Sequence, residues 1–180
     1  MPILRILPFG IFALLLAFAA GTYAGLPAAI PTHFDFSGAV TGVRTKSIQS
    51  WFGLPVIALG VHLLLLTVTQ MLPKRPHLFN FPDKDRFLRL PTAYRGPVIA
   101  AMQWTLDLTS LLVMLVMATV QVLMWRASLG KADGIAHLSL LIFSILLGPA
   151  ILISITRVTN AVDAAERRWR EDERSGRVRP

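Results

Sequence analysis

Two ionisable side chains lie inside otherwise apolar stretches, where their chemistry would be unusual. His62 lies near the centre of the stretch 51–72, and Asp107 lies within the stretch 98–125, with Gln103 one helical turn before it. Such groups are costly in lipid and usually face a bundle interior or a wet cavity. A proton or ion relay through His62 and Asp107 is one interpretation. A simpler interpretation is that these residues, together with Asn160, form hydrogen bonds that join the helices. A third interpretation is a cavity for a lipid or peptide.

A second group of side chains could bind a metal ion. His33 and Asp35 form a His-x-Asp arrangement in the segment 24–50, and Asp133 and His137 precede and begin the last apolar stretch. Two imidazoles and two carboxylates are ligands that zinc accepts. The spacing is a weak indication, because a histidine can fix a loop and an aspartate can cap a turn. We therefore expect neither a metal ion nor a cofactor, and His33, Asp35 and His137 are the residues at which zinc would be tested.

Enzyme motifs are missing from the sequence. There is no Gly-rich phosphate loop, no HExxH, no Gly-x-Ser-x-Gly and no cysteine. Asp107 has no partner acid in the apolar stretches, as an intramembrane aspartyl enzyme would need. The expected protein is not an enzyme.

The composition defines the class of protein that positions these residues. Of 180 residues, 54% are hydrophobic and 16% are charged, and the mean hydropathy is +0.59. A soluble domain carries about 25% charged residues, so a soluble globular protein and a disordered chain are both excluded. The lack of cysteine excludes a disulfide-stapled domain. The net charge of +8 is interpreted as a topology signal, and no nucleic-acid partner is expected because no recognition motif accompanies it.

Four apolar stretches are long enough to cross about 30 Å of hydrocarbon as helices. They cover residues 6–23, 51–72, 98–125 and 137–157. Amphipathic rings lie near their ends, where the headgroups would be, at Tyr23, Trp51, Trp104 and Trp125. The predicted fold class is an all-α integral membrane bundle of four transmembrane helices. The first stretch also resembles a signal peptide, and we expect it to be retained because no strong A-x-A site follows it.

The distribution of Lys and Arg predicts the orientation. The connection 73–97 and the tail 163–180 carry six basic residues each, whereas the segments 24–50 and 126–136 carry two each. Basic residues stay on the cytoplasmic side. We therefore expect a multi-pass protein of the bacterial inner membrane with both termini in the cytoplasm. Residues 1–162 would form the membrane domain, with an external loop at 24–50, and residues 163–180 a charged cytoplasmic tail.

The two cytoplasmic segments have different patterns. The connection 73–97 interleaves basic and aromatic residues, which predicts a short interfacial helix capped by Asn80, with Arg86 and Arg89 on anionic lipid. It would act as a membrane-surface strut or as a regulatory contact surface. In the tail, Asp163 to Arg167 and Glu166 to Arg170 are favourable i,i+4 pairs. The last helix should therefore continue into the cytoplasm until Gly176, as a solvated extension or as a docking surface for a protein partner.

The external segment 24–50 is the most specific passage of the sequence. Pro31 forces Ile30 toward extended geometry, and Phe34 and Phe36 alternate around Asp35 as in a short strand. Glycines that mark turns follow at Gly38 and Gly42, and a lysine follows at Lys46. These residues predict a structured loop packed over the bundle.

This passage resembles a bacterial membrane family, the domain of unknown function 1648. The family hallmark is a Leu-Pro, then Ile-Pro-x-His-Phe, then a Gly and a Lys, and the matching residues are Leu26, Pro27, Ile30, Pro31, His33, Phe34, Gly38 and Lys46. The resemblance covers roughly residues 8–70. Where the family usually has an acidic residue after the Gly, this chain has Val40 and Thr41. The same module opens the SdpI-type immunity proteins, so the resemblance implies a membrane protein of defence or signalling.

Two functions follow as expectations. The first is a non-enzymatic sensor or immunity-like protein whose external Pro-x-His-Phe loop meets an envelope peptide or small molecule. The second is a small transporter or proton-coupled permease that uses His62 and Asp107. The two halves of the sequence show no repeat, which disfavours an inverted-repeat carrier, although a homodimer would supply symmetry.

Overall fold

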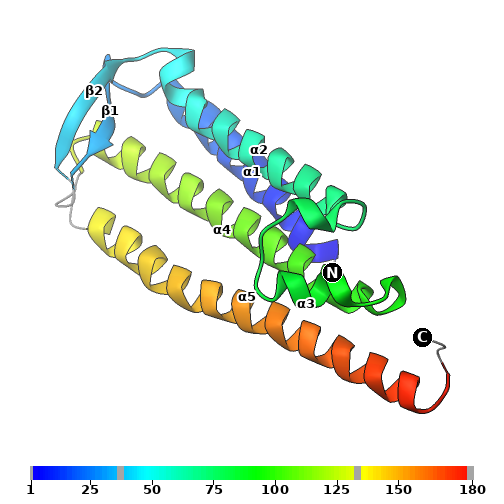
Figure 1. Ribbon diagram of the computed structural model, residues 1–180. Helices are drawn as coiled ribbons and strands as arrows, with labels where there is room; N and C mark the ends of the chain where they lie inside the picture. Colours follow the sequence, from blue (N-terminus) through cyan, green and yellow to red (C-terminus); the bar gives the residue numbers. More distant parts are fainter. Residues whose placement is uncertain (1, 36–38, 132–134, 178–180) are drawn as a thin grey trace.

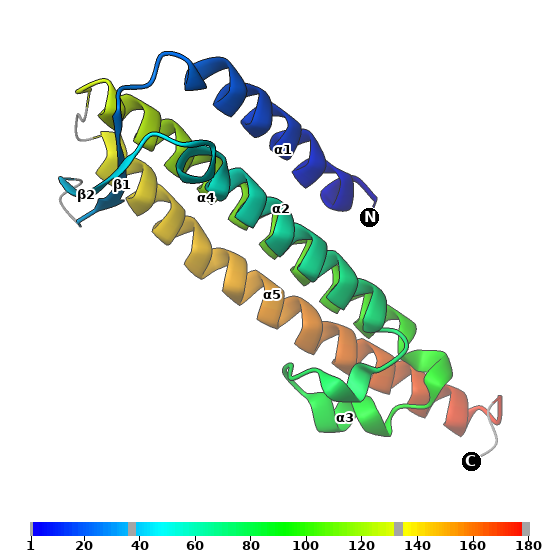
Figure 2. The same ribbon diagram turned by 90° about the horizontal axis from the view of Figure 1, so that it is seen from above.

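The computed structural model describes residues 2–35, 39–131 and 135–177. Four long helices run side by side, and a β-hairpin closes one end of the bundle (Figures 1 and 2). The long helices are α1 (Pro2–Tyr23), α2 (Ile48–Met71), α4 (Gly96–Ser128) and α5 (Ile135–Arg174). The hairpin consists of β1 (Ala29–Phe34) and β2 (Val40–Thr45). Between α2 and α4 lie two 3₁₀ turns and the short helix α3 (Lys84–Arg89).

All four long helices are long and apolar enough to cross a membrane, which confirms this part of the expected fold class. Their most apolar 18-residue windows have mean hydropathies between 1.6 and 2.3. At most 28% of any window is buried inside the protein. The apolar side chains on the outer surface therefore need a lipid environment, because water would not solvate them favourably.

Helix α4 is central to the bundle, since it packs against α1, α2 and α5 (Figure 1). Three clusters of buried residues follow one another along it. One lies beneath the hairpin and contains Trp51 and Met124. A middle one contains Leu15, Ala58 and Met114. The third joins α3, α4 and α5 around Phe87, Val98 and Val162.

Both termini lie at the end of the bundle opposite the hairpin (Figure 1). Helix α3 lies at the same end as the termini, so the basic connection and the basic tail are neighbours, as the charge pattern predicts. Helix α5 continues to Arg174, well beyond its apolar part, and Gly176 follows with φ of +71°. The predicted extension of the last helix is therefore confirmed. The charged part of α5, beyond residue 162, lies outside the apolar segment.

The predicted interfacial helix is wrong in its start and in its surroundings. Helix α3 has six residues, and Asp83, rather than Asn80, precedes it, with φ of 58° and no capping hydrogen bond from its side chain. Phe87 is 0% exposed and packs in the cluster shared with α4 and α5. The aromatic face therefore packs on protein and not on lipid, because the helical extension of α5 supplies a partner that the local pattern did not reveal.

Candidate functional site

The motif of the segment 24–50 forms the hairpin. Strand β1 pairs antiparallel with β2, from Ala29 opposite Thr45 to Phe34 opposite Val40. Ile30 in β1 is 0% exposed and belongs to the cluster around Trp51. Strand β2 lies on the outside, where Val43 is 62% exposed. The extended geometry predicted at Ile30 is confirmed, whereas the strand predicted around Asp35 lies earlier in the chain, since β1 ends at Phe34 and Phe36 lies outside the described residues.

Lys46 joins the end of the hairpin to the end of α1. Its Nζ donates hydrogen bonds to the carbonyl oxygens of Ala24 (3.1 Å) and Leu26 (3.0 Å) and lies 5.0 Å from the centre of the Tyr23 ring. Carbonyl groups at a helix C-terminus lack helical partners and attract a positive charge. The lysine of the motif therefore stabilises the chain path between α1 and β1.

A capping box starts α2 directly after Lys46. The Oγ of Ser47 accepts a hydrogen bond from the backbone N–H of Ser50 (3.0 Å), and the Oγ of Ser50 accepts one from the N–H of Ser47 (2.9 Å). These two bonds satisfy donors that the helix start leaves free. The position of the hairpin relative to α2 is thus fixed by local sequence.

Trp51 ties three helices together beneath the hairpin. Its Nε1 donates to the carbonyl oxygen of Ala19 in α1 (2.9 Å), and its own carbonyl oxygen accepts from Nε2 of Gln121 in α4 (3.3 Å). The side chain is 0% exposed. The expectation that Trp51 is an anchor at the headgroup level is therefore wrong, because the ring faces the bundle interior. The hydrogen bond between Gln121 and the backbone of Trp51 is not predictable from local sequence, since 70 residues separate the two.

His33 is exposed on the hairpin. Its Nδ1 lies 3.1 Å from the Oγ1 of Thr32, and its ring covers Gly42, where a Cβ atom would lie 3.1 Å from Nδ1. Gly42 therefore lies within β2 and allows close approach of the ring, rather than marking a turn. Gly38 lies outside the described residues.

Asp35 caps the tip of the hairpin. Its Oδ1 accepts a hydrogen bond from the N–H of Ala39 (3.0 Å), and its own N–H donates to the carbonyl oxygen of Ala39 (3.0 Å). In the described part of the chain, no three His, Cys, Asp or Glu side chains are grouped as metal ligands. Asp133 and the side chain of His137 lie outside the described residues, so the zinc arrangement is not tested there.

Asp107 forms a bidentate ion pair with Arg5 of α1. The distances are 3.1 Å from Nη2 to Oδ2 and 3.3 Å from Nε to Oδ1. The Asp107 side chain is 7% exposed and that of Arg5 is 36% exposed. A buried carboxylate in an apolar segment is costly unless it is paired, and Arg5 supplies the pairing. The partner is not predictable from local pattern, because Arg5 lies 102 residues before Asp107.

His62 has partners of its own. Its Nδ1 lies 2.6 Å from the Oγ of Ser110 on α4, and the Phe9 ring packs edge-on against it at 4.4 Å between centroids. Its Nε2 is buried without a hydrogen-bond partner among the described residues. Ser110 lies one turn after Asp107, so His62 and Asp107 face the same region of the bundle but bond different groups.

Gln103 and Asn160 are the other two polar residues predicted within the membrane segments, and each lies in an environment of its own. Gln103 donates from Nε2 to the carbonyl oxygen of Thr69 on α2 (3.0 Å). Asn160 is exposed on α5. The interpretation of polar contacts between helices therefore holds for His62, Gln103 and Asp107 but not for Asn160.

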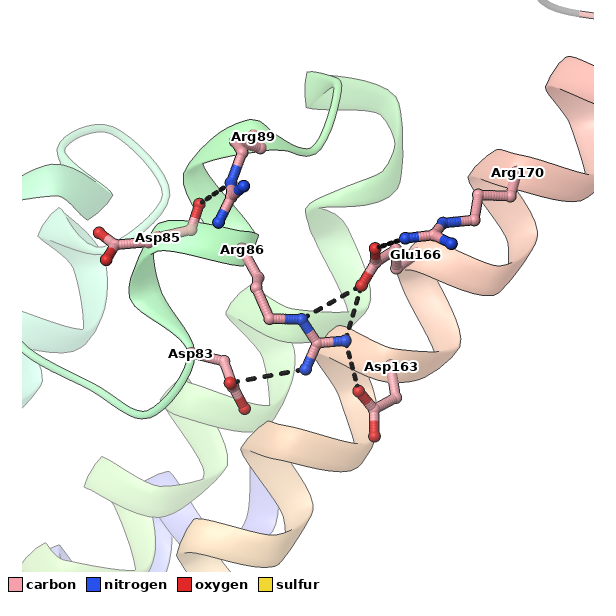
Figure 3. A network of polar contacts seen from close by, with 7 residues as sticks. All are labelled: Asp83, Asp85, Arg86, Arg89, Asp163, Glu166 and Arg170. Carbon is pink, nitrogen blue, oxygen red and sulfur yellow. Dashed lines mark hydrogen bonds and ion pairs between the residues drawn. The ribbon is translucent and has the colours of Figure 1, made fainter.

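A polar network joins α3 to the charged part of α5 (Figure 3). The Nη2 of Arg86 lies 2.6 Å from Oε2 of Glu166 and 2.7 Å from Oδ1 of Asp163, and its Nη1 lies 3.5 Å from Oδ1 of Asp83. Glu166 also pairs with Arg170. The predicted contact of Arg86 with anionic lipid is therefore wrong. The predicted Glu166 to Arg170 pair is confirmed.

The network shifts the titration of its members. Hydrogen bonds from Arg86, and then from Arg170, hold the pKa of Glu166 below its usual range. Hydrogen bonds to Glu166 and Asp163 hold the pKa of Arg86 above its usual range. Both groups remain charged at neutral pH. The contact between α3 and α5 is consequently an ionic one.

The fold defines a mostly helical chain with the features of a multi-pass membrane protein. Residues 10–59, from α1 through the hairpin into α2, match the family model of a domain of unknown function (DUF1648). The match confirms the resemblance seen in the motif. No curated protein and no solved structure matches the chain.

Proposed function

We propose that the chain is a non-enzymatic protein of the bacterial inner membrane that binds an envelope ligand through the hairpin β1–β2, as a sensor or an immunity-like protein. The observation that best supports this proposal is that some motif residues hold the hairpin in place while others are exposed. Ile30, Pro31 and Lys46 are used to hold the hairpin, whereas His33 and the outer strand β2 are exposed. A rigid, exposed element of this kind is suited to binding.

Charge supports an outward-facing hairpin. The end of the bundle that carries the termini also carries the connection 73–97 and the tail, with six basic residues in each. The hairpin end carries fewer basic residues. By the positive-inside rule, the hairpin belongs outside the cytoplasm and both termini inside it.

The contacts of the buried polar residues favour binding over transport. The Asp107 carboxylate bonds Arg5, and Nδ1 of His62 bonds Ser110. An apolar layer of Leu15, Ala58 and Met114 lies between this region and the cluster beneath the hairpin. A relay would need proton carriers to continue through this layer, and its described members have none.

The proposal is tested by complementation of a deletion strain. The strain is challenged with a panel of secreted peptide toxins and envelope-active antibiotics, and wild type is expected to restore tolerance to at least one of them. A hairpin variant, His33→Ala with Val43→Ser, should fail to restore it at normal membrane abundance. The matched control replaces the buried pair together, Arg5→Gln with Asp107→Asn, so that no lone charge remains, and it should restore tolerance.

Two results would contradict the proposal. If deletion changes no sensitivity in the panel, the immunity-like function is rejected. If the paired Arg5→Gln and Asp107→Asn variant fails while the hairpin variant restores tolerance, the function resides in the intramembrane polar residues and the transporter hypothesis takes its place.

A further inference from the structure

Helices α4 and α5 separate within the apolar part of the bundle. Near the termini they are in close contact, since Val158, Val162 and Ala165 of α5 are at most 4% exposed. Toward the hairpin end, residues 145–153 of α5 are exposed except for Ala150, which is partly buried. The helices therefore diverge where only lipid is available as solvent.

A groove of about 420 Å³ lies between the diverging helices. Aliphatic side chains form most of its lining, with Leu108, Leu112 and Val116 on α4 and Leu147, Ala150 and Ile151 on α5. An empty apolar groove within a bilayer would lose dispersion contacts, so an acyl chain is the occupant that fits its chemistry.

An arginine lies at the end of this groove nearer the termini. Trp104 lies one turn before the lining residue Leu108 on α4, and Arg157 lies one turn after the lining residue Ser154 on α5, so helical spacing puts both residues beside the end of the groove. The Cζ of Arg157 lies 4.5 Å from the centre of the Trp104 ring.

Arg157 differs from the arginines of the α3–α5 network. Its side chain is exposed, and within the described residues no carboxylate lies within ion-pair distance of it. It follows directly on the apolar part of α5, at the level where interfacial tryptophans occur. A guanidinium at this level matches the geometry of a phosphate group, and the indole beneath it holds it in place.

We propose that this groove binds one anionic phospholipid, with an acyl chain between α4 and α5 and the headgroup phosphate on Arg157. The site is separate from the hairpin and does not depend on the proposed envelope ligand. The bound lipid would fill the gap that the divergence of α5 from α4 leaves. It would thereby support the helix that carries the cytoplasmic tail.

The test measures lipid binding to the full chain in detergent by native mass spectrometry. Phosphatidylglycerol is titrated against phosphatidylcholine, and wild type should bind one phosphatidylglycerol in preference. Arg157→Gln should weaken phosphatidylglycerol binding about fivefold, the factor that corresponds to about 1 kcal/mol for one arginine at a lipid surface. The control Arg174→Gln, an exposed arginine of the same helix beyond the groove, should change nothing.

A second variant tests the groove itself. Ala150→Trp fills the groove without changing a charge, and it should reduce retention of the bound lipid while Arg157 is intact. Circular dichroism of each variant establishes that the helices form. The proposal is overturned if wild type binds both lipids equally or if Arg157→Gln and Arg174→Gln behave alike. It is also overturned if Ala150→Trp leaves lipid retention unchanged but converts a dimer into a monomer, because a second copy would then cover the groove.

Discussion

Replacing Lys46 by methionine should loosen the hairpin without unfolding the bundle. The substitution leaves an unbranched side chain that is one atom shorter, and it removes the two hydrogen bonds to the carbonyl oxygens of Ala24 and Leu26 and the cation's contact with the Tyr23 ring. Hydrogen bonds to a charged group contribute about 1.5–3 kcal/mol each. Because Lys46 is partly exposed and water competes for these carbonyls, we expect a total loss of about 2–3 kcal/mol, or a roughly 30- to 150-fold rise in hairpin opening.

Hydrogen exchange of the protein in nanodiscs measures this opening directly. The amides of β1 and β2 should exchange faster in Lys46→Met by that factor, whereas amides of α4 should not change. Arg44→Met is the matched control, because Arg44 is an exposed cation on β2 that loses charge in the same way. If the two variants exchange alike, the contacts of Lys46 do not stabilise the hairpin and the structural role assigned to the motif lysine is wrong.

Three further outcomes are expected from the described contacts. Arg5→Gln or Asp107→Asn alone should lower the stability in detergent, measured by thermal unfolding, by about 1–3 kcal/mol. The double variant should regain part of this loss, since it leaves no lone charge, and strictly additive losses would contradict the ion pair between the two residues. The pKa of Glu166 is lowered, so its contact with Arg86 stabilises the fold at pH values above the ordinary pKa of a glutamate, and this stabilisation is lost as the pH falls through the lowered pKa. The unfolding midpoint should therefore decline less between pH 7 and pH 3 in Glu166→Gln than in wild type, and an equal decline in the two proteins would refute this. Trp51→Phe removes the N–H that reaches α1 and replaces the buried indole by a smaller ring, so the lost hydrogen bond, worth about 1 kcal/mol, and the cavity should together cost at least about 1 kcal/mol in the same unfolding assay; no measurable cost would count against both contacts.

The sequence was sufficient to predict the helices and the extension of α5. Helix-forming stretches depend on local hydrophobicity, and the acid-before-base pairs of the tail, such as Glu166 to Arg170, are local as well. The extended geometry of Ile30 is predictable for the same reason, because Pro31 restricts its immediate neighbour. These predictions needed no knowledge of tertiary packing.

The partners of the buried and charged residues could not be predicted from local patterns. Arg5 and Asp107 are 102 residues apart, and Arg86 and Glu166 are 80 apart. Which pairs form depends on the packing of α1 and α5 on α4, and composition does not specify that packing. The local pattern therefore predicts lipid contact for α3, whereas Phe87 and Arg86 contact α5.

The proposed function requires the hairpin to lie outside the cytoplasm and the tail to lie within it. The chain has no cysteine, so a single introduced cysteine reports its own location. Val43→Cys on the exposed strand β2 and Arg168→Cys on the exposed side of α5 are treated with a membrane-impermeant maleimide in intact spheroplasts. We predict that position 43 is labelled in intact spheroplasts and that position 168 is labelled only after the spheroplasts are permeabilised. Labelling at 168 but not at 43 in intact cells would contradict both the orientation and the proposed role of the hairpin.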